Sequence, residues 1–266
     1  DLLSHFASPD PAVRTEGVFE VLRRKRRPLR QWEQLLASDA APEQVEGVFA
    51  ALSAIGGEPA PPLLLAAATG SDPVRQAIAF RHLGDHPGTE NHPVYAEIGR
   101  ATVPALTAGI LSAMDRSGTT TPGLDELVLS FAGHPDALLA ATARAYLQAR
   151  ASEDVCFAAL DDDSREEAWP VAFAVLSGIR RTSVVEGIVR RLEHTRSARK
   201  RVLGHEALVA LYHDDASTRR PWEGTALVKS YLETALGNHR VDRAALLRRM
   251  SAAGIPLPPP PVLLAL

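Results

Sequence analysis

Apolar residues recur along this chain at helical spacing, in short blocks separated by polar residues and prolines. The clearest block lies between Asp72, a good N-cap, and Gly84, which suits a helix end. Pro73 fits the first helical position because its missing amide has no partner there. The block has an apolar stripe at roughly helical spacing, formed by Val74, Ala77, Ile78, Ala79 and Leu83. We therefore predict an amphipathic helix from Pro73 to Leu83.

Prolines recur at a fixed spacing of 31 residues, at Pro11, Pro42, Pro73, Pro104 and Pro135. The flanking sequence repeats too, because residues 16–19 and residues 46–49 both read Glu-Gly-Val-Phe. A constant period in this range is typical of stacked helical repeats. The prolines predict the second helix of each pair, and the same phase predicts further second helices over 165–179 and 199–211. Shorter apolar segments predict the first helices, over 2–7, 31–37, 63–69, 95–101, 124–132, 155–160 and 184–192.

This pattern predicts an all-α fold, a right-handed α-solenoid of stacked antiparallel helix pairs with a period of about 31 residues. Each pair is too small to bury its apolar face alone and has to pack against its neighbours. We expect the solenoid to cover residues 1–255. An irregular loop over 212–225 and a C-terminal helix pair over 226–253 are included, and a proline-rich tail or linker follows over 256–266.

Two helix starts resemble the turn of HEAT-type repeats. They are Asp10-Pro11-Ala12-Val13-Arg14 and Asp72-Pro73-Val74-Arg75, which is one residue shorter. The resemblance implies that aspartate and arginine brace successive repeats by hydrogen bonds. This role is carried over to Asp10, Arg14, Asp72 and Arg75, with Pro11 and Pro73 in the turn. The resemblance covers most of residues 1–212.

A second, weaker resemblance involves Leu211-Tyr212-His213 and Pro221-Trp222-Glu223-Gly224-Thr225. These residues look like the helical-repeat region of planctomycete-type secreted proteins that combine a dehydrogenase-like propeller with a c-type haem domain. The resemblance implies a spacer or docking region between redox domains, in an extracytoplasmic location. The chain itself has one cysteine, Cys156, and therefore no Cys-x-x-Cys-His haem motif and no internal disulfide.

Charge and composition exclude several classes of function. A net charge of −3 argues against general affinity for nucleic acid. No apolar run reaches the length of about 18 residues that a membrane span needs. The sequence begins at Asp1 and has methionine only at 114 and 250, so we expect a segment of a larger multidomain protein.

Two clusters are candidates for binding a partner, and each also has a structural interpretation. Trp222 lies in the irregular loop with His213, Arg219 and Arg220, and tryptophan and arginine are frequent at binding hot spots. Alternatively, Trp222 packs over the last repeat and Glu223 caps the next helix. The basic run that contains Arg23, Arg24 and Arg26 either binds an anionic partner or is a solvated helix end.

Histidines suggest two metal sites, which the local sequence disfavours. His82, Asp85, His86, Glu90 and His92 lie close together, but Gly84 and Pro87 break the helix that would align them. His205-Glu206 lacks the second histidine of a zinc-protease helix, because Val209 stands in its place. We expect no catalytic, cofactor-binding or metal-binding residues.

The leading functional hypothesis is a noncatalytic helical-repeat scaffold whose second helices bind a protein partner or neighbouring domains of the same chain. One alternative is the spacer region of a secreted dehydrogenase–cytochrome c protein. Another is a helical-repeat enzyme resembling a DNA glycosylase or a bilin lyase, of which the former would need a basic groove with aromatic residues.

Overall fold

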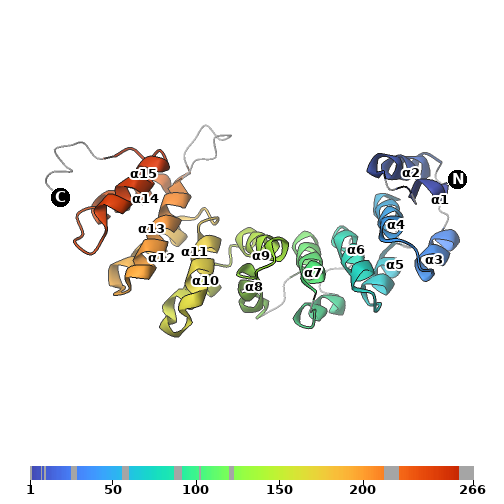
Figure 1. Cartoon of the computed structure of the whole chain (residues 1–266), viewed down its shortest axis with the longest axis horizontal. Helices are drawn as coiled ribbons and strands as arrows, with labels where there is room; N and C mark the ends of the chain where they lie inside the picture. Colours follow the sequence, from blue (N-terminus) through green and yellow to red (C-terminus); the bar gives the residue numbers. More distant parts are fainter. Residues whose placement is uncertain are drawn as a thin grey trace. The chain divides into compact units, whose positions relative to one another are not determined.

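The structure is a computed structural model that describes residues 2–6, 8, 10–24, 29–55, 60–86, 92–101, 103–119, 123–212 and 222–257. Over these residues it contains fifteen α-helices, two 3-10 helices and no strand (Figure 1). The prediction of an all-α fold is therefore confirmed. Among these helices, none combines the length and apolar character needed to cross a lipid bilayer.

The described residues form two compact units. The first comprises Asp1–Leu124 and His134–Tyr146. Within it α2 packs against α4, α4 against α6, and α6 against α7, so helices about 31 residues apart are neighbours (Figure 1). Its helices are α1 (Leu2–Phe6), α2 (Pro11–Arg24), α3 (Leu29–Ala37), α4 (Pro42–Ile55), α5 (Ala60–Ala68), α6 (Pro73–Leu83), η1 (Pro93–Gly99), α7 (Pro104–Ser117) and most of α9 (Ala137–Ala149).

The second unit comprises Asp125–Gly133 and Leu147–Leu266. In this unit α11 packs between α10 and α13, α12 packs against α13 and α14, and α13 also contacts α14 and α15. Its helices are most of α8 (Leu124–Ala132), α10 (Glu153–Asp161), η2 (Asp163–Ala168), α11 (Trp169–Leu176), α12 (Thr182–His194), α13 (Ala198–Tyr212), α14 (Thr225–Ala235) and α15 (Arg243–Ala252). The tail over 258–266 lies outside the described residues.

Four of the five periodic prolines are the first residue of a helix. α2, α4, α6 and α7 start at Pro11, Pro42, Pro73 and Pro104, whereas α9 starts two residues after Pro135. At α6 the Asp72 carboxylate accepts hydrogen bonds from the amides of Val74 and Arg75, as expected for an N-cap. Proline and cap therefore fix the start of the helix together.

Equivalent positions of the repeat differ in burial. The phenylalanine that closes the Glu-Gly-Val-Phe sequence is fully buried in α4, as Phe49, but Phe19 in α2 is 66% exposed. The leucine three residues later is 39% exposed at Leu22 and 2% exposed at Leu52. In the corresponding place of α6, Phe80 is 1% exposed. The phenylalanine position of the repeat is thus buried in α4 and α6 and exposed in α2.

Three details of the predicted helices were wrong. The helix over 165–179 is divided into η2 and α11, with non-helical angles at Arg165 (φ −114°, ψ 46°). Pro170 explains this division, because a proline inside a helix removes a hydrogen bond and clashes with the preceding turn. The segment at 95–101 is the 3-10 helix η1, which starts at Pro93. Val74, assigned to the apolar stripe, is 50% exposed, while Phe80 completes the buried face.

Gly84 directly follows the end of α6, as expected, but it does so without the left-handed conformation that glycine often supplies at a helix end. Its φ of −63° is ordinary right-handed backbone, so it does not supply a left-handed cap. A Cβ atom at this position would lie 2.5 Å from the carbonyl oxygen of Ala113 in α7. Glycine is needed here because the backbones of α6 and α7 come into close contact.

Candidate functional site

Arg75 joins α6 to the loop between α3 and α4. Its guanidinium donates hydrogen bonds to the carbonyl oxygens of Leu36 (2.7 Å), Ser38 (2.6 Å) and Ala40 (3.2 Å). Its Nε atom lies 3.3 Å from the carboxylate of Asp72. Most of the donors of this guanidinium are therefore used within the protein.

At the start of α2, hydrogen bonds of Asp10 and Arg14 join residues close in sequence. Arg14 donates to the carbonyl oxygen of Ser8 at 2.8 Å, and the carboxylate of Asp10 accepts from the amide of Ala12 at 2.8 Å. The contacts recorded for Asp10 thus lie at the start of its own helix, whereas the hydrogen bonds of Arg75 to carbonyl oxygens span 35 to 39 residues.

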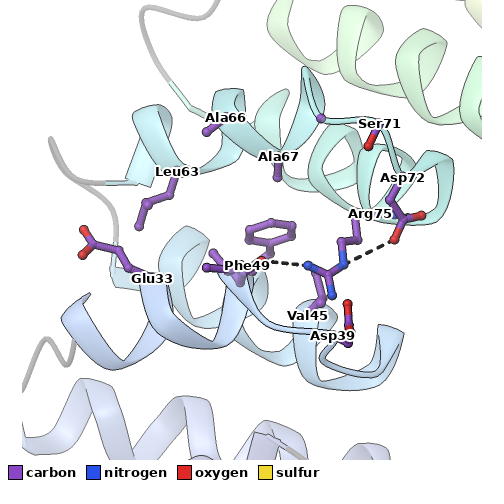
Figure 2. Close-up of a pocket in the computed structure, with 13 residues that line it drawn as sticks. Glu33, Asp39, Val45, Phe49, Leu63, Ala66, Ala67, Ser71, Asp72 and Arg75 are labelled. Carbon is purple, nitrogen blue, oxygen red and sulfur yellow. Dashed lines mark hydrogen bonds and ion pairs between the residues drawn. The ribbon is translucent and has the colours of Figure 1, made fainter.

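A cleft of about 480 Å³ lies beside Arg75, between α3 and α5, with α4 beneath it (Figure 2). Its apolar lining includes Leu36 and Leu63, which are half-buried, and the exposed Ala66, above the buried ring of Phe49. Carboxylates stand at both ends: Glu33 lies at one end, and Asp39 and Asp72 lie at the other with Arg75 (Figure 2). The volume lies within the usual range for ligand-binding clefts, about 300–1,000 Å³.

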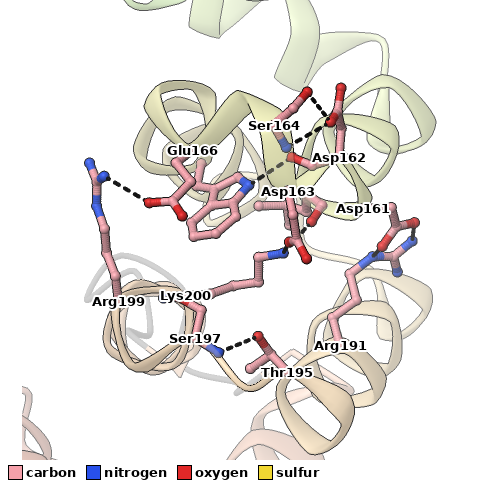
Figure 3. A network of polar contacts seen from close by, with 12 residues as sticks. Asp161, Asp162, Asp163, Ser164, Glu166, Arg191, Thr195, Ser197, Arg199 and Lys200 are labelled. Carbon is pink, nitrogen blue, oxygen red and sulfur yellow. Dashed lines mark hydrogen bonds and ion pairs between the residues drawn. The ribbon is translucent and has the colours of Figure 1, made fainter.

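A polar network in the second unit joins α12 and α13 to the preceding helices (Figure 3). Lys200 is 6% exposed, and its ammonium donates to the carbonyl of Leu160 (2.6 Å) and to Asp163 (2.7 Å). The same ammonium lies 4.0 Å from the ring centroid of Trp169, a favourable cation–π arrangement. These partners neutralise and solvate a charge that would be costly to bury alone.

Two further ion pairs flank Lys200 (Figure 3). Arg191 binds both carboxylate oxygens of Asp161, at 2.8 and 2.6 Å, and Arg199 lies 3.6 Å from Glu166. The cleft beside this network has a volume of about 440 Å³ and also contains His194 and Arg196. Its three carboxylates, Asp161, Asp163 and Glu166, are each paired with a cation of the protein, so none of them is left unpaired to attract a cation.

Several long-range ion pairs have their two charges in the same order along the chain. The cation lies on the helix that comes later in the chain, and the carboxylate lies 30 to 43 residues earlier. Examples are Arg81–Glu46, Arg116–Asp85, Arg191–Asp161, Lys200–Asp163 and Arg249–Glu206. In these ion pairs the carboxylate therefore always precedes the cation along the chain.

Histidines of the first unit bind neighbouring helices. His82 lies 2.9 Å from Glu46, and His86, which is buried, lies 3.4 Å from the hydroxyl of Ser53. Burial lowers the pKa of His86. Burial also opposes ionisation of Glu46, but the hydrogen bond with His82 and the charge of Arg81 hold its pKa below the ordinary value. Glu90 lies outside the described residues.

Two buried groups of the second unit are held in their neutral forms. Burial, with the charges of Arg249 and Arg201, lowers the pKa of His205 to about 4. Burial raises the pKa of the Cys156 thiol to about 12, with a smaller contribution from Asp125. A thiol of this kind is a poor nucleophile because little thiolate is present at neutral pH.

Trp222 is half-buried, and its indole Nε1 donates to the carbonyl of Leu211 at 2.8 Å. This bond ties the residue to the end of α13. Glu223 does not cap α14, since Gly224 is the N-cap and no side chain bonds the free amides. The other predicted interaction residues of this loop, His213, Arg219 and Arg220, lie outside the described residues.

Arg23 lies at the surface of α2, where its side chain is 75% exposed and pairs with Glu20 of the same helix at 2.7 Å. Arg24 ends the helix, and Arg26 lies outside the described residues. The structure thus gives Arg23 a local partner and leaves the role of the basic run as a prediction.

Sequence reasoning missed the cleft beside Arg75. Glu33 and Asp39 are single carboxylates in a short helix and a loop, without a motif, and Leu63 reads as an ordinary core residue. A signal did exist in the run of small residues that ends α5, Ala66-Ala67-Ala68, which leaves space above α4. Neither protein-family models nor the sequences of curated proteins match this chain.

Proposed function

We propose that this chain is a noncatalytic helical-repeat module of the HEAT type, in which stacked helix pairs hold a protein partner or neighbouring domains of the same chain. The observation that carries the proposal is the recurrence of one packing relationship at the repeat period. α2, α4, α6 and α7 start at prolines 31 residues apart and pack in succession. Arg75 adds a hydrogen-bonded brace from the start of α6 to carbonyl oxygens that lie 35 to 39 residues earlier.

The chemistry of the described side chains supports binding rather than catalysis. The ionisable groups whose pKa values are shifted most are the buried His205 and Cys156 and the half-buried Tyr231, and desolvation keeps all three neutral. Catalysis by acid, base or nucleophile requires such groups to converge on a site that substrate can reach. The buried lysine, Lys200, is occupied by Leu160, Asp163 and the Trp169 ring.

The glycosylase-like alternative is disfavoured by charge. A DNA-binding groove neutralises phosphates with lysine and arginine. The cleft between α3 and α5 instead carries Glu33, Asp39 and Asp72, and its one arginine is occupied. A spacer role in a secreted redox protein is compatible with the module, and the extracytoplasmic location rests on that resemblance alone.

Titration calorimetry with any domain that the reading frame encodes before or after these residues tests the proposal. We expect binding that is reduced when Trp222 is replaced by alanine or when Ala66, in the cleft, is replaced by tryptophan. Helicity by circular dichroism serves as the folding control. No binding by any flanking domain would contradict the part of the proposal that concerns neighbouring domains. If neither variant changed the binding, Trp222 and the cleft would be excluded as the binding surfaces.

A further inference from the structure

The cleft between α3 and α5 combines an apolar centre with acidic ends. Leu36 and Leu63 contribute half-buried apolar surface, and Ala66 is exposed between the walls. Figure 2 shows Glu33 beyond one end of the apolar centre and Asp39 beyond the other. Both of these carboxylates are exposed, and neither is recorded in an ion pair or hydrogen bond within the described ranges.

Among the described residues that line the cleft, the one cation, Arg75, does not neutralise these carboxylates. The guanidinium of Arg75 is held by the carbonyls of Leu36, Ser38 and Ala40, and it pairs with Asp72. Asp72 also caps α6 through the amide of Val74 at 2.9 Å. Glu33 and Asp39 are therefore the charges left for an incoming molecule, and an anionic ligand would meet repulsion from both.

We propose that this cleft binds a protein segment with apolar residues at its centre and lysine or arginine on both sides. The apolar side chains would cover Leu36, Leu63 and Ala66, which gains free energy from removing apolar surface from water. The flanking cations would pair with Glu33 at one end and Asp39 at the other. Exposed pairs of this kind contribute more to orientation and to the rate of association than to affinity.

This inference rests on the proposed function, because it assigns a partner chemistry to one surface of the binding module. The inference concerns only the cleft, whereas the proposed function also includes binding of a flanking domain at Trp222. The apolar centre distinguishes the partner from a simple polycation, and the acidic ends distinguish it from a phosphorylated or acidic peptide.

Fluorescence anisotropy with two labelled synthetic peptides tests the inference on the full 266-residue chain. One peptide has two leucines at its centre and two lysines on each side, and the other has glutamates in place of the lysines. We expect the lysine peptide to bind at least about tenfold more tightly, and more weakly as salt rises.

Three variants locate the binding. Ala66→Trp fills the cleft from its exposed side and should abolish binding of the lysine peptide. Glu33→Lys combined with Asp39→Lys should weaken it by about five- to tenfold. Glu16→Lys, which reverses an exposed carboxylate of α2 outside the cleft, should leave it unchanged. Circular dichroism of each variant checks that the fold is intact.

Equal affinity for the two peptides, no binding of the lysine peptide at millimolar concentration, or binding that survives Ala66→Trp would each overturn the inference. If the lysine peptide fails while a flanking domain binds in a manner sensitive to Trp222→Ala, only the inference is lost. If the chain binds neither, the inference is overturned and the proposed function loses its two assigned surfaces.

Discussion

Arg75 donates a hydrogen bond to the carbonyl oxygen of Leu36, 39 residues earlier in the chain, at 2.7 Å. The same guanidinium reaches Ser38 and Ala40. One side chain at the start of α6 therefore satisfies carbonyls at the end of α3 and in the loop after it. These carbonyls would otherwise depend on water.

Replacing Arg75 by lysine should lower the free energy of unfolding by about 1.5–3 kcal/mol, because an ammonium cannot reproduce the fork of donors that binds several carbonyls. Urea denaturation followed by circular dichroism measures the change. Arg23→Lys is the matched control, since Arg23 is exposed and pairs only within its helix. Equal stability of the two variants would show that the brace is unimportant.

Phe19 and Phe49 offer a matched pair from the repeated Glu-Gly-Val-Phe sequence. Phe49→Ala should destabilise the protein by about 3–5 kcal/mol, because it leaves a cavity in the core. Phe19→Ala should change the stability by less than about 0.5 kcal/mol, since the ring is 66% exposed. Thermal and urea unfolding measure both. A large effect at Phe19 would mean that this ring is covered in solution.

Gly84→Ala should destabilise the packing of α6 on α7 by about 1–3 kcal/mol, because the new Cβ would lie 2.5 Å from the Ala113 carbonyl oxygen. Gly99→Ala is the control, since a Cβ there meets nothing within 4 Å. The melting temperatures of the two variants provide the comparison. A stabilising Gly84→Ala would contradict the close contact between the two backbones.

His205 should make stability depend on pH. Its folded pKa of about 4 lies below the ordinary value of 6.5, so the unfolded chain binds the proton more tightly. The free energy of unfolding should therefore fall as the pH drops from about 6.5 to about 4, by up to roughly 3 kcal/mol. Urea titrations across this range, with His205→Phe for comparison, isolate the effect. If the stability of the two proteins changed with pH in the same way, His205 would not be the source of the pH dependence.

The sequence predicts those features of the structure that depend on residues close together in the chain. Pro11, Pro42, Pro73 and Pro104 mark helix starts because proline acts on its own turn. The division before α11 is also local, because Pro170 disrupts the turn that precedes it. The exposure of Phe19 could not be read from the sequence, since the phenylalanine of the same four-residue sequence is buried in α4 and the difference arises from neighbours distant in sequence.

The cleft between α3 and α5 also depends on contacts between residues distant in sequence. The N-cap role of Asp72 follows from its position before Pro73, but the pairing of Arg75 with Leu36 depends on how α6 packs against α4. The resemblance to HEAT repeats pointed to the arginine as a brace. The charges left for a ligand, Glu33 and Asp39, became apparent only when the contacts of Arg75 were known.

Hydrogen exchange on a chain that ends at Tyr212 tests the central claim, that neighbouring helix pairs shield one another in succession. Such a chain lacks α14 and α15, which contact α12 and α13. Stacked repeats are stabilised mainly by their nearest neighbours. We therefore expect protection to be lost in α12 and α13 and retained in α10 and α11. Loss of protection throughout α10 to α13 would show one closed cooperative bundle and would contradict the account.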